Sequence, residues 1–145
     1  MFTHSVEIGR SPEDVFAYLD QPERHKEWQE QITSTRVESE GPIGVGTRVA
    51  ESRRIRGREI PSGYEITEHD PPRRSSFRGT EGPIRPVGTV IVEPIGDGSS
   101  SRVTLEFELV GRGVAKLFAP IVRRQAYKQI PLDQGKLKQR LESGA

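Results

Sequence analysis

The spacing of apolar residues predicts one long helix near the end of the chain, from Gly113 to Leu141. One stripe of the helical period is formed by Val114, Leu117, Phe118 and Ile121, which fall at i, i+3, i+4 and i+7. We expect this stripe to pack against the rest of the protein. Replacing Leu117 or Phe118 with Ala should then destabilise the fold by about 2–5 kcal/mol, and by less if the residue lines a roomy cavity.

The same segment contains two prolines and a second apolar stripe. Leu137 and Leu141 continue at i+4, but they lie roughly 150° around the axis from the first stripe. A straight helix could not bury both stripes against one surface, and a proline inside a helix costs about 3 kcal/mol. Pro120 and Pro131 therefore predict kinks or restarts, and the pattern leaves the direction of the helix after Pro131 open.

The start of the chain alternates apolar and polar residues, which predicts a strand over Phe2–Ile8. Ser11-Pro12-Glu13-Asp14 then has the features of a helix start, with Ser11 as the cap. Val15, Phe16 and Leu19 would form the inner face of this helix. A second short helix is predicted after Pro22, ending near Trp28.

The middle of the chain consists of strand patterns separated by turns rich in Gly and Pro. Six further strands are predicted over Ile32–Ser39, Thr47–Arg56, Ile60–Glu68, Arg74–Thr80, Val87–Glu93 and Arg102–Leu109. Gly96-Asp97-Gly98 is typical of a hairpin turn that needs positive φ. The prediction is an α+β fold with seven antiparallel strands, two short helices after the first strand and one long C-terminal helix.

Composition limits the class of protein. A chain of 145 residues fits one domain, residues 1–145. With 22 basic and 21 acidic residues there is no general argument for a nucleic-acid partner. No cysteine occurs, no signal peptide is evident, and no run of apolar residues is long enough to span a membrane. We expect a soluble cytoplasmic protein, and the sequence does not determine its oligomeric state.

Several landmarks resemble the START-like helix-grip superfamily, also called the SRPBCC group, in its polyketide cyclase/dehydrase branch. They are the opening I-x-x-S-P-E-D-V-F-A-Y-L-D-Q-P-E-R-H-K-E-W, the turn G-P-I-G-V-G-T-R, the corner E-H-D-P-P-R-R and L-F-A-P-I-V-R-R in the last helix. The resemblance covers essentially the whole chain. It implies a seven-stranded antiparallel sheet wrapped around the long helix, with an apolar ligand cavity between them. Pro131 and Gly135 depart from the family pattern, in which that helix is continuous.

Motifs for catalysis are missing. The chain has no nucleophile elbow, no glycine-rich phosphate loop and no H-E-x-x-H motif, so we expect no metal and no obligatory cofactor. His25 lies among charged residues and should be solvated. Glu68-His69-Asp70 superficially suggests metal ligands, but neighbouring strand residues point to opposite faces. His4 shares the inner face of the first strand, where a hydrogen-bonded structural role is favoured over a catalytic one.

Two polar features leave alternatives open. A run of arginines from Arg53 to Arg58 is typical of a solvated strand edge, yet Arg48 or Arg54 could instead reach inward to bind an acidic ligand. Gln125 lies on the apolar stripe of the long helix. Either backbone or water satisfies it, or it faces the pocket and binds a polar group of the ligand.

The first functional hypothesis is a carrier or sensor that binds a hydrophobic small molecule such as a lipid, polyketide or isoprenoid. Its ligand-binding residues would be Trp28, Arg54, Tyr64, Phe77, Phe107, Phe118, Ile121 and Gln125. The resemblance suggests a second hypothesis, a polyketide aromatase/cyclase. The candidate residues for it are His4, Arg54, Tyr64, Arg78 and Glu81. A third is a protein-interaction module that uses the sheet as its docking surface.

Overall fold

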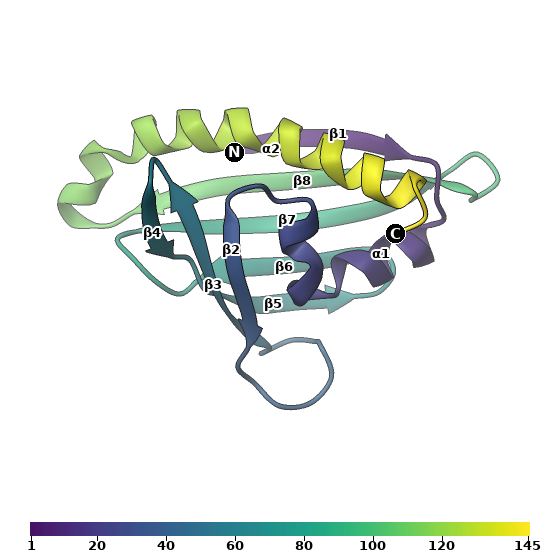
Figure 1. Ribbon diagram of the computed structural model, residues 1–145, viewed down its shortest axis with the longest axis horizontal. Coiled ribbons are helices and arrows are strands. Elements are labelled where there is room, and N and C mark those ends of the chain that lie inside the picture. The colour runs from purple at the N-terminus through teal and green to yellow at the C-terminus, as the bar shows by residue number, and fades with distance from the viewer.

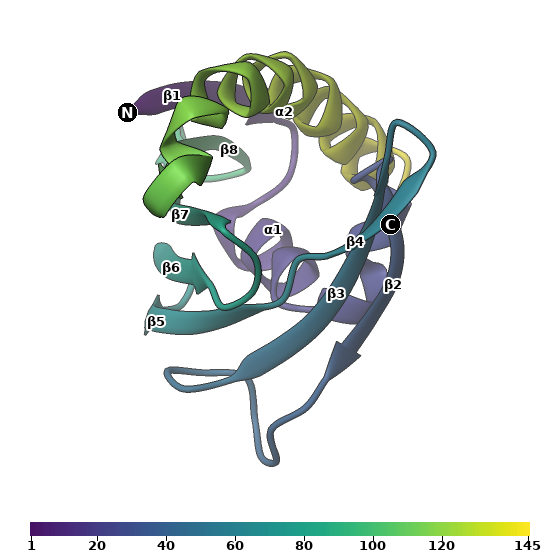
Figure 2. The same cartoon turned by 90° about the vertical axis from the view of Figure 1, so that its left-hand side faces the viewer.

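One antiparallel sheet curls around a long helix in the computed structural model, which describes residues 1–145 (Figures 1 and 2). The strands are β1 (Phe2–Ile8), β2 (Ile32–Val37), β3 (Arg48–Ile55), β4 (Arg58–Pro61), β5 (Tyr64–Asp70), β6 (Arg74–Gly79), β7 (Ile84–Ile95) and β8 (Ser100–Gly111). The helices are α1 (Pro12–Leu19), η1 (Pro22–Glu27), η2 (Gly113–Leu117) and α2 (Ala119–Glu142), of which η1 and η2 are 3₁₀ turns. The predicted α+β helix-grip architecture is confirmed.

The main path of the sheet has seven strands in the order β1-β8-β7-β6-β5-β3-β2, and β4 pairs with β3 beside this path. The segment predicted as one strand, Ile60–Glu68, is therefore divided between β4 and β5. At the division the Ser62 N–H donates to the Glu51 carbonyl. A Cβ at Gly63 would lie 2.9 Å from the Val49 carbonyl oxygen, so the chain passes this close to β3 only with glycine.

The register of the first and last strands agrees with the predicted inner face. Val6 lies opposite Val103, and His4 lies opposite Leu105. Val103 is buried, whereas Glu106 pairs with Thr3 on the other face. Because side chains alternate along a strand, this register places Val6 together with Val103, Leu105 and Phe107 on the concave side of the sheet.

The segment after β1 forms the two short helices that were predicted. The Ser11 hydroxyl accepts a hydrogen bond from the Asp14 N–H at 3.2 Å and caps α1. Val15 and Phe16 are buried, and Leu19 is partly buried. The 3₁₀ turn η1 follows at once, and together these elements cover one end of the sheet.

Of the two interruptions predicted in the C-terminal helix, the one at Pro120 is found as a restart, because η2 ends at Leu117 and α2 begins at Ala119. No restart occurs at Pro131. Pro120 lies in the first turn of α2, where the missing N–H would have no partner in the helix. The helix then continues through Pro131 and Gly135 to Glu142. Ile130 and Leu137 are buried on either side of Pro131, and this packing offsets the roughly 3 kcal/mol that an interior proline costs.

The stripe predicted to face the sheet is the wrong one. Val114, Leu117, Phe118 and Ile121 are 80%, 78%, 59% and 60% exposed. The buried positions are instead Ala115, Ala119, Ile130, Leu137 and Leu141. A Cβ at Gly111 would lie 3.1 Å from the Lys116 Cα, so η2 approaches β8 almost backbone to backbone. Only small side chains fit such a contact, and the large ones project away from it.

The fully packed core lies at one end of the molecule. It consists of Ile8, Val15, Phe16, Tyr18, Val92, Val103, Leu137 and Leu141. These residues come from β1, α1, β7, β8 and the C-terminal half of α2. None of the helices combines the length and apolarity that crossing a membrane requires.

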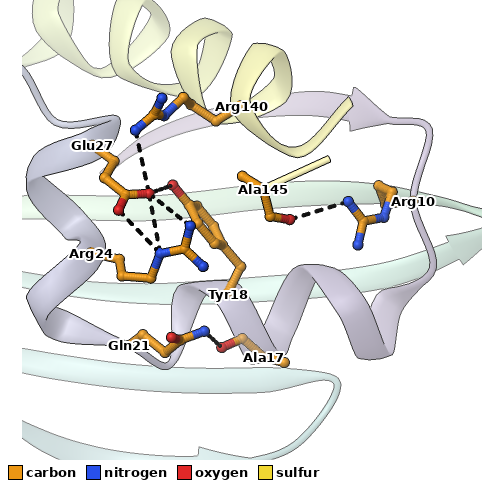
Figure 3. A network of polar contacts seen from close by, with 8 residues as sticks. All are labelled: Arg10, Ala17, Tyr18, Gln21, Arg24, Glu27, Arg140 and Ala145. Carbon is orange, nitrogen blue, oxygen red and sulfur yellow. Dashed lines mark hydrogen bonds and ion pairs between the residues drawn. The ribbon is translucent and has the colours of Figure 1, made fainter. Parts of the chain in front are cut away.

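A polar network closes the same end between η1 and the last turns of α2 (Figure 3). Glu27 accepts from Arg24 and from the Tyr18 hydroxyl at 2.8 Å, and it pairs with Arg140 of α2 at 3.5 Å. Arg10 donates to the Leu141 carbonyl at 2.7 Å. The C-terminal half of α2 is thus held by buried apolar contacts and by a ring of hydrogen bonds.

The burial pattern generates a stability prediction that contrasts two leucines of the C-terminal segment. Leu137→Ala should lower the free energy of unfolding by about 2–5 kcal/mol because it opens a cavity in the packed core. Leu117→Ala should change it by less than about 0.5 kcal/mol because that side chain is largely in solvent. Urea denaturation of both variants measures the difference, and a larger loss for Leu117→Ala would contradict this assignment of faces.

Candidate functional site

Beyond the core, the concave face of the sheet is apolar but not fully covered. Leu105 and Phe107 of β8, Val90 of β7, Phe77 of β6 and Tyr64 of β5 are all partly buried. The strand pairings place these five residues on one continuous surface. An inner sheet face that is apolar and only partly packed is suited to binding an apolar molecule.

Aromatic rings line this surface. The ring of Phe77 lies over Gly88, where a Cβ would be 2.6 Å from the Phe77 Cζ. Tyr64 meets Phe77 edge to face, with ring centroids 5.7 Å apart. On the α2 side, Tyr127 stacks on Phe2 of β1 with centroids 4.3 Å apart. The rings therefore border the inner surface from α2 across to β5.

Two charged residues of β3 also face inward. Arg53 Nε donates to Glu51 Oε1 at 2.9 Å, and the Ser62 hydroxyl donates to the same oxygen at 3.2 Å. Arg53 Nη2 donates to Oε1 of Gln29, just after η1. The Glu51 side chain is only 3% exposed. A carboxylate so deeply buried needs these partners, because an isolated buried charge would be very costly.

The middle of α2 contributes another buried carboxyl group. Asp133 Oδ1 accepts from Gln129 Nε2 at 2.9 Å and from the Glu30 N–H at 3.4 Å. Burial raises the pKa of Asp133 above its ordinary value, although these hydrogen bonds act in the opposite direction. The carboxyl group of Asp133 therefore keeps its proton to a higher pH than a carboxyl group in water does.

Two histidines make hydrogen bonds that account for a structural role. His4 Nδ1 donates to Oε1 of the buried Gln134, whose Nε2 donates back to the His4 carbonyl at 3.2 Å. His69 Nε2 lies 2.8 Å from an oxygen of Asp20. The neighbours of His69 are engaged elsewhere, because Glu68 pairs with Arg74 and Asp70 with Arg73. The three residues thus point apart, and no metal-binding group of His, Cys, Asp and Glu occurs in the structure.

His25 is not solvated, contrary to the expectation from its charged neighbours in sequence. Its Nε2–H donates to the Leu19 carbonyl at 2.7 Å, and its ring meets the edge of Trp28. Burial lowers the pKa of His25, so the imidazole is held in its neutral form near pH 7. The Nδ1 atom then carries a lone pair that can accept a proton.

Three polar side-chain groups of this region make no hydrogen bond. The indole N–H of Trp28 and the hydroxyl of Thr35 are buried without a partner. Trp28 packs against the border of the core, and Thr35 lies opposite Glu51 in the sheet. The Tyr64 hydroxyl also makes none, and burial raises its pKa far enough to keep it protonated. Unpartnered buried donors are rare and need an explanation.

Only some of the residues predicted to bind a ligand lie on or beside the inner surface of the sheet. Trp28, Tyr64, Phe77 and Phe107 lie on or beside the inner surface. Arg54 points outward and pairs with Glu59, so neither it nor the exposed Arg48 reaches inward. Phe118 and Ile121 are exposed. Gln125 is partly buried and makes no side-chain hydrogen bond. Ligand binding by these residues is still a prediction.

Of the residues predicted for cyclase chemistry, too, only some face inward. Arg78 lies on the outer face, where its guanidinium pairs with Glu65 at 2.8 Å, and Glu81 is exposed. His4 and Tyr64 face inward, but His4 is engaged by Gln134. The expected pairing of these groups across one enclosed space is therefore not found.

Sequence reasoning missed the inward polar residues Glu51, Arg53 and Asp133. A usable signal existed for the first two. They alternate with the same parity as Val49 and Ile55, the apolar residues of β3, so they share the inner face. A comparable signal marked Asp133, which lies four residues before Leu137 and therefore continues the second apolar stripe of the helix.

Comparisons with known proteins agree with this architecture. The family model described as polyketide cyclase/dehydrase and lipid transport matches residues 1–142. The Zhui aromatase/cyclase from a Streptomyces species has a TM-score of 0.84 at 13% identity, over 97% of this chain and 92% of that one. A START superfamily protein from Mycobacterium smegmatis has a TM-score of 0.82 at 13% identity, over 99% of this chain and 98% of that one.

The di-domain ARO/CYC BexL is similar over only part of its length. It has a TM-score of 0.79 at 17% identity, and the match covers 97% of this chain but 46% of BexL. The chain therefore spans about half of that protein. Identities this low show a shared fold and nothing finer. No curated protein sequence matches the chain.

Asp133 generates a prediction for the dependence of stability on pH. Because the folded-state pKa of Asp133 is raised, ionisation destabilises the fold, and this penalty is present above the raised pKa and absent below the ordinary value. Asp133→Asn keeps an oxygen that can accept from Gln129, so it should stabilise the protein at pH 7 and give no gain near pH 3. Thermal unfolding across this range measures both values.

A control of opposite sign is available in the β7–β8 turn. The Ser99 hydroxyl and N–H lower the pKa of Asp97, so Asp97→Asn should lose stability at pH 7 and lose none at low pH. An Asp133→Asn variant that is less stable than the parent at pH 7 would mean that the carboxylate is stabilising where it lies.

Proposed function

Because the chain belongs to the polyketide cyclase/dehydrase and lipid transport family, we propose that it binds a hydrophobic small molecule between the sheet and α2. The molecule would be of lipid, polyketide or isoprenoid type. Its apolar part would lie along the partly buried surface of Leu105, Phe107, Val90 and Phe77. Covering such a surface is favourable by about 25 cal/mol per Å² of apolar area removed from water.

The observation that carries the proposal is the set of unpartnered donors at the border of this surface. A buried polar group without a partner costs about 1–3 kcal/mol. The indole N–H of Trp28 is such a group, and the Tyr64 hydroxyl makes no hydrogen bond although its ring is partly buried. A ligand with a carbonyl or hydroxyl oxygen could accept a hydrogen bond from either donor and would be oriented by it.

A second candidate function, a polyketide aromatase/cyclase, is favoured by the pKa direction of one buried group. Burial raises the pKa of Asp133, which moves a carboxylic acid towards the operating pH. Groups with pKa values near the operating pH are the effective proton donors and acceptors in catalysis. Such a carboxyl group could support enolisation and dehydration of a bound poly-ketone. The first function needs no such chemistry, so we place it ahead.

Three further expectations accompany the proposal. We infer that residues 1–145 act as a single domain and that the protein is cytoplasmic. The protein-interaction module is the third-ranked function.

The proposal is tested by replacing one hydroxyl. Tyr64→Phe removes a group that makes no hydrogen bond, so the stability of the free protein should be nearly unchanged. Affinity for a ligand that bonds to this hydroxyl should fall about two- to tenfold, the usual contribution of a neutral hydrogen bond. Native mass spectrometry of freshly purified protein would identify a retained ligand. Fluorescence titration with 8-anilinonaphthalene-1-sulfonate would then report on occupancy of the inner surface.

Tyr18→Phe is the matched control because its hydroxyl does have a partner, Glu27, in the packed end of the protein. It should lower stability by about 1 kcal/mol and leave ligand affinity unchanged. Failure to detect any retained molecule, together with dye binding unaffected by Tyr64→Phe, would contradict the proposed function.

A further inference from the structure

The start of the C-terminal segment presents large apolar side chains to solvent. Val114 and Leu117 of η2, Phe118 and Ile121 are all more than half exposed. Leu132, also 65% exposed, lies on the same side of α2 as Ile121, because eleven residues make close to three helical turns. Single exposed apolar residues are ordinary, but a run of this length in one segment is not.

Basic residues border these apolar side chains. Between Leu109 and Leu132 the chain contains Arg112, Lys116, Arg123, Arg124 and Lys128 and no acidic residue. None of the five forms an ion pair, although twelve ion pairs occur elsewhere in the protein. Arg123 alone is engaged, through a hydrogen bond to the Leu109 carbonyl at 3.0 Å. We call the exposed apolar residues together with Arg112, Lys116, Arg124 and Lys128 the basic apolar face.

The close packing of η2 against β8 fixes the direction of this face. Gly111 approaches the backbone of Lys116, and Ala115 and Ala119 fill the remaining space. Because small residues point inward here, the large ones must point outward. The face therefore begins at a close backbone contact at one end of the molecule, away from the C-terminus (Figures 1 and 2), and continues along α2.

We propose that the basic apolar face docks the protein onto the surface of a membrane that contains anionic lipids. Leu117, Phe118 and Ile121 would enter the boundary between headgroups and acyl chains, as in amphipathic segments that lie in a membrane surface. Lys116, Arg124 and Lys128 would meet the negative headgroups. The binding is peripheral, and it requires no spanning helix.

Charge argues against a second copy of the chain as the occupant. A symmetric dimer through this face would bring two sets of unpaired basic residues together, because a two-fold interface places the same patch on both sides. An anionic bilayer offers both the opposite charge and an apolar interior. The chain as a whole carries a formal charge of only +1, so the attraction is local to this face.

Docking is independent of the proposed ligand. A membrane surface would bring the inner site close to a pool of hydrophobic molecules, but vesicle binding can be measured whether or not a ligand is held. The two proposals can therefore fail separately.

The experiment is sedimentation of the full chain with sucrose-loaded vesicles. We expect binding to vesicles of phosphatidylcholine with 30–40% phosphatidylglycerol (roughly the anionic content needed for a strong surface potential) to exceed binding to pure phosphatidylcholine by about tenfold or more. Added salt should weaken it, because screening shortens the range of the attraction. Lys116→Gln/Arg124→Gln/Lys128→Gln and Leu117→Ser/Phe118→Ser should each lose at least about tenfold in binding.

A matched charge control is Arg48→Gln/Arg56→Gln/Arg58→Gln, which removes the same net charge from exposed residues without ion pairs on β3, β4 and their turn. It should bind like the parent. The variants of the basic apolar face change exposed side chains, and unchanged thermal unfolding will show that they fold.

Two outcomes would overturn the proposal. One is parent protein that stays in the supernatant with anionic vesicles, or that binds equally well when the basic apolar face is altered. The other is a concentration-dependent dimer in sedimentation velocity that Leu117→Ser/Phe118→Ser dissociates, which would assign the face to a second copy of the chain.

Discussion

The packing of Leu137 and Leu141 into one end of the curled sheet is the contact on which the rest of the structure depends. These two side chains reach Ile8 of β1 and Val15 and Phe16 of α1, so a single cluster joins the first and last elements of the chain. Hydrogen bonds from Arg10 and the ion pair between Arg140 and Glu27 enclose that cluster. With α2 anchored there, the remaining inner face of the sheet does not have to be filled. It can hold partly exposed aromatic rings and buried polar groups without loss of the fold.

The architecture could be predicted because it depends on periodicity and on turn residues. Alternation over Phe2–Ile8 and in the last strand gave the correct inner face, and the Ser11 cap marked α1. The face of the C-terminal helix was mispredicted because its inner side is made by Ala115 and Ala119, which carry little hydrophobic signal. A pattern of large apolar residues cannot reveal a contact that excludes them. The interruption expected at Pro131 failed for a related reason: tertiary packing outweighed a local preference.

The candidate site was predictable only where it is apolar. Tyr64, Phe77 and Phe107 follow from strand parity, but the polar members do not follow from residue type. Arg54 and Arg53 are neighbours of identical chemistry, and only the pleat of β3 decides that Arg53 meets Glu51 inside while Arg54 meets Glu59 outside. His25 shows the same limit, since its charged neighbours in sequence suggested solvent whereas its imidazole is bonded to the Leu19 carbonyl. Three-dimensional neighbours, rather than sequence neighbours, set the chemistry of these groups.

The place where Phe77 crosses Gly88 has a consequence for how the interior can vary. The space between β7 and the Phe77 ring holds only the hydrogen atom of Gly88, because a methyl group at this position would lie 2.6 Å from the ring. Variation at this position can act in one direction only: any side chain takes volume from the interior or pushes the ring aside, and none can add volume. At this point of the sheet, a wider interior therefore requires a smaller residue in place of Phe77, whereas a narrower one can arise by a single substitution at residue 88.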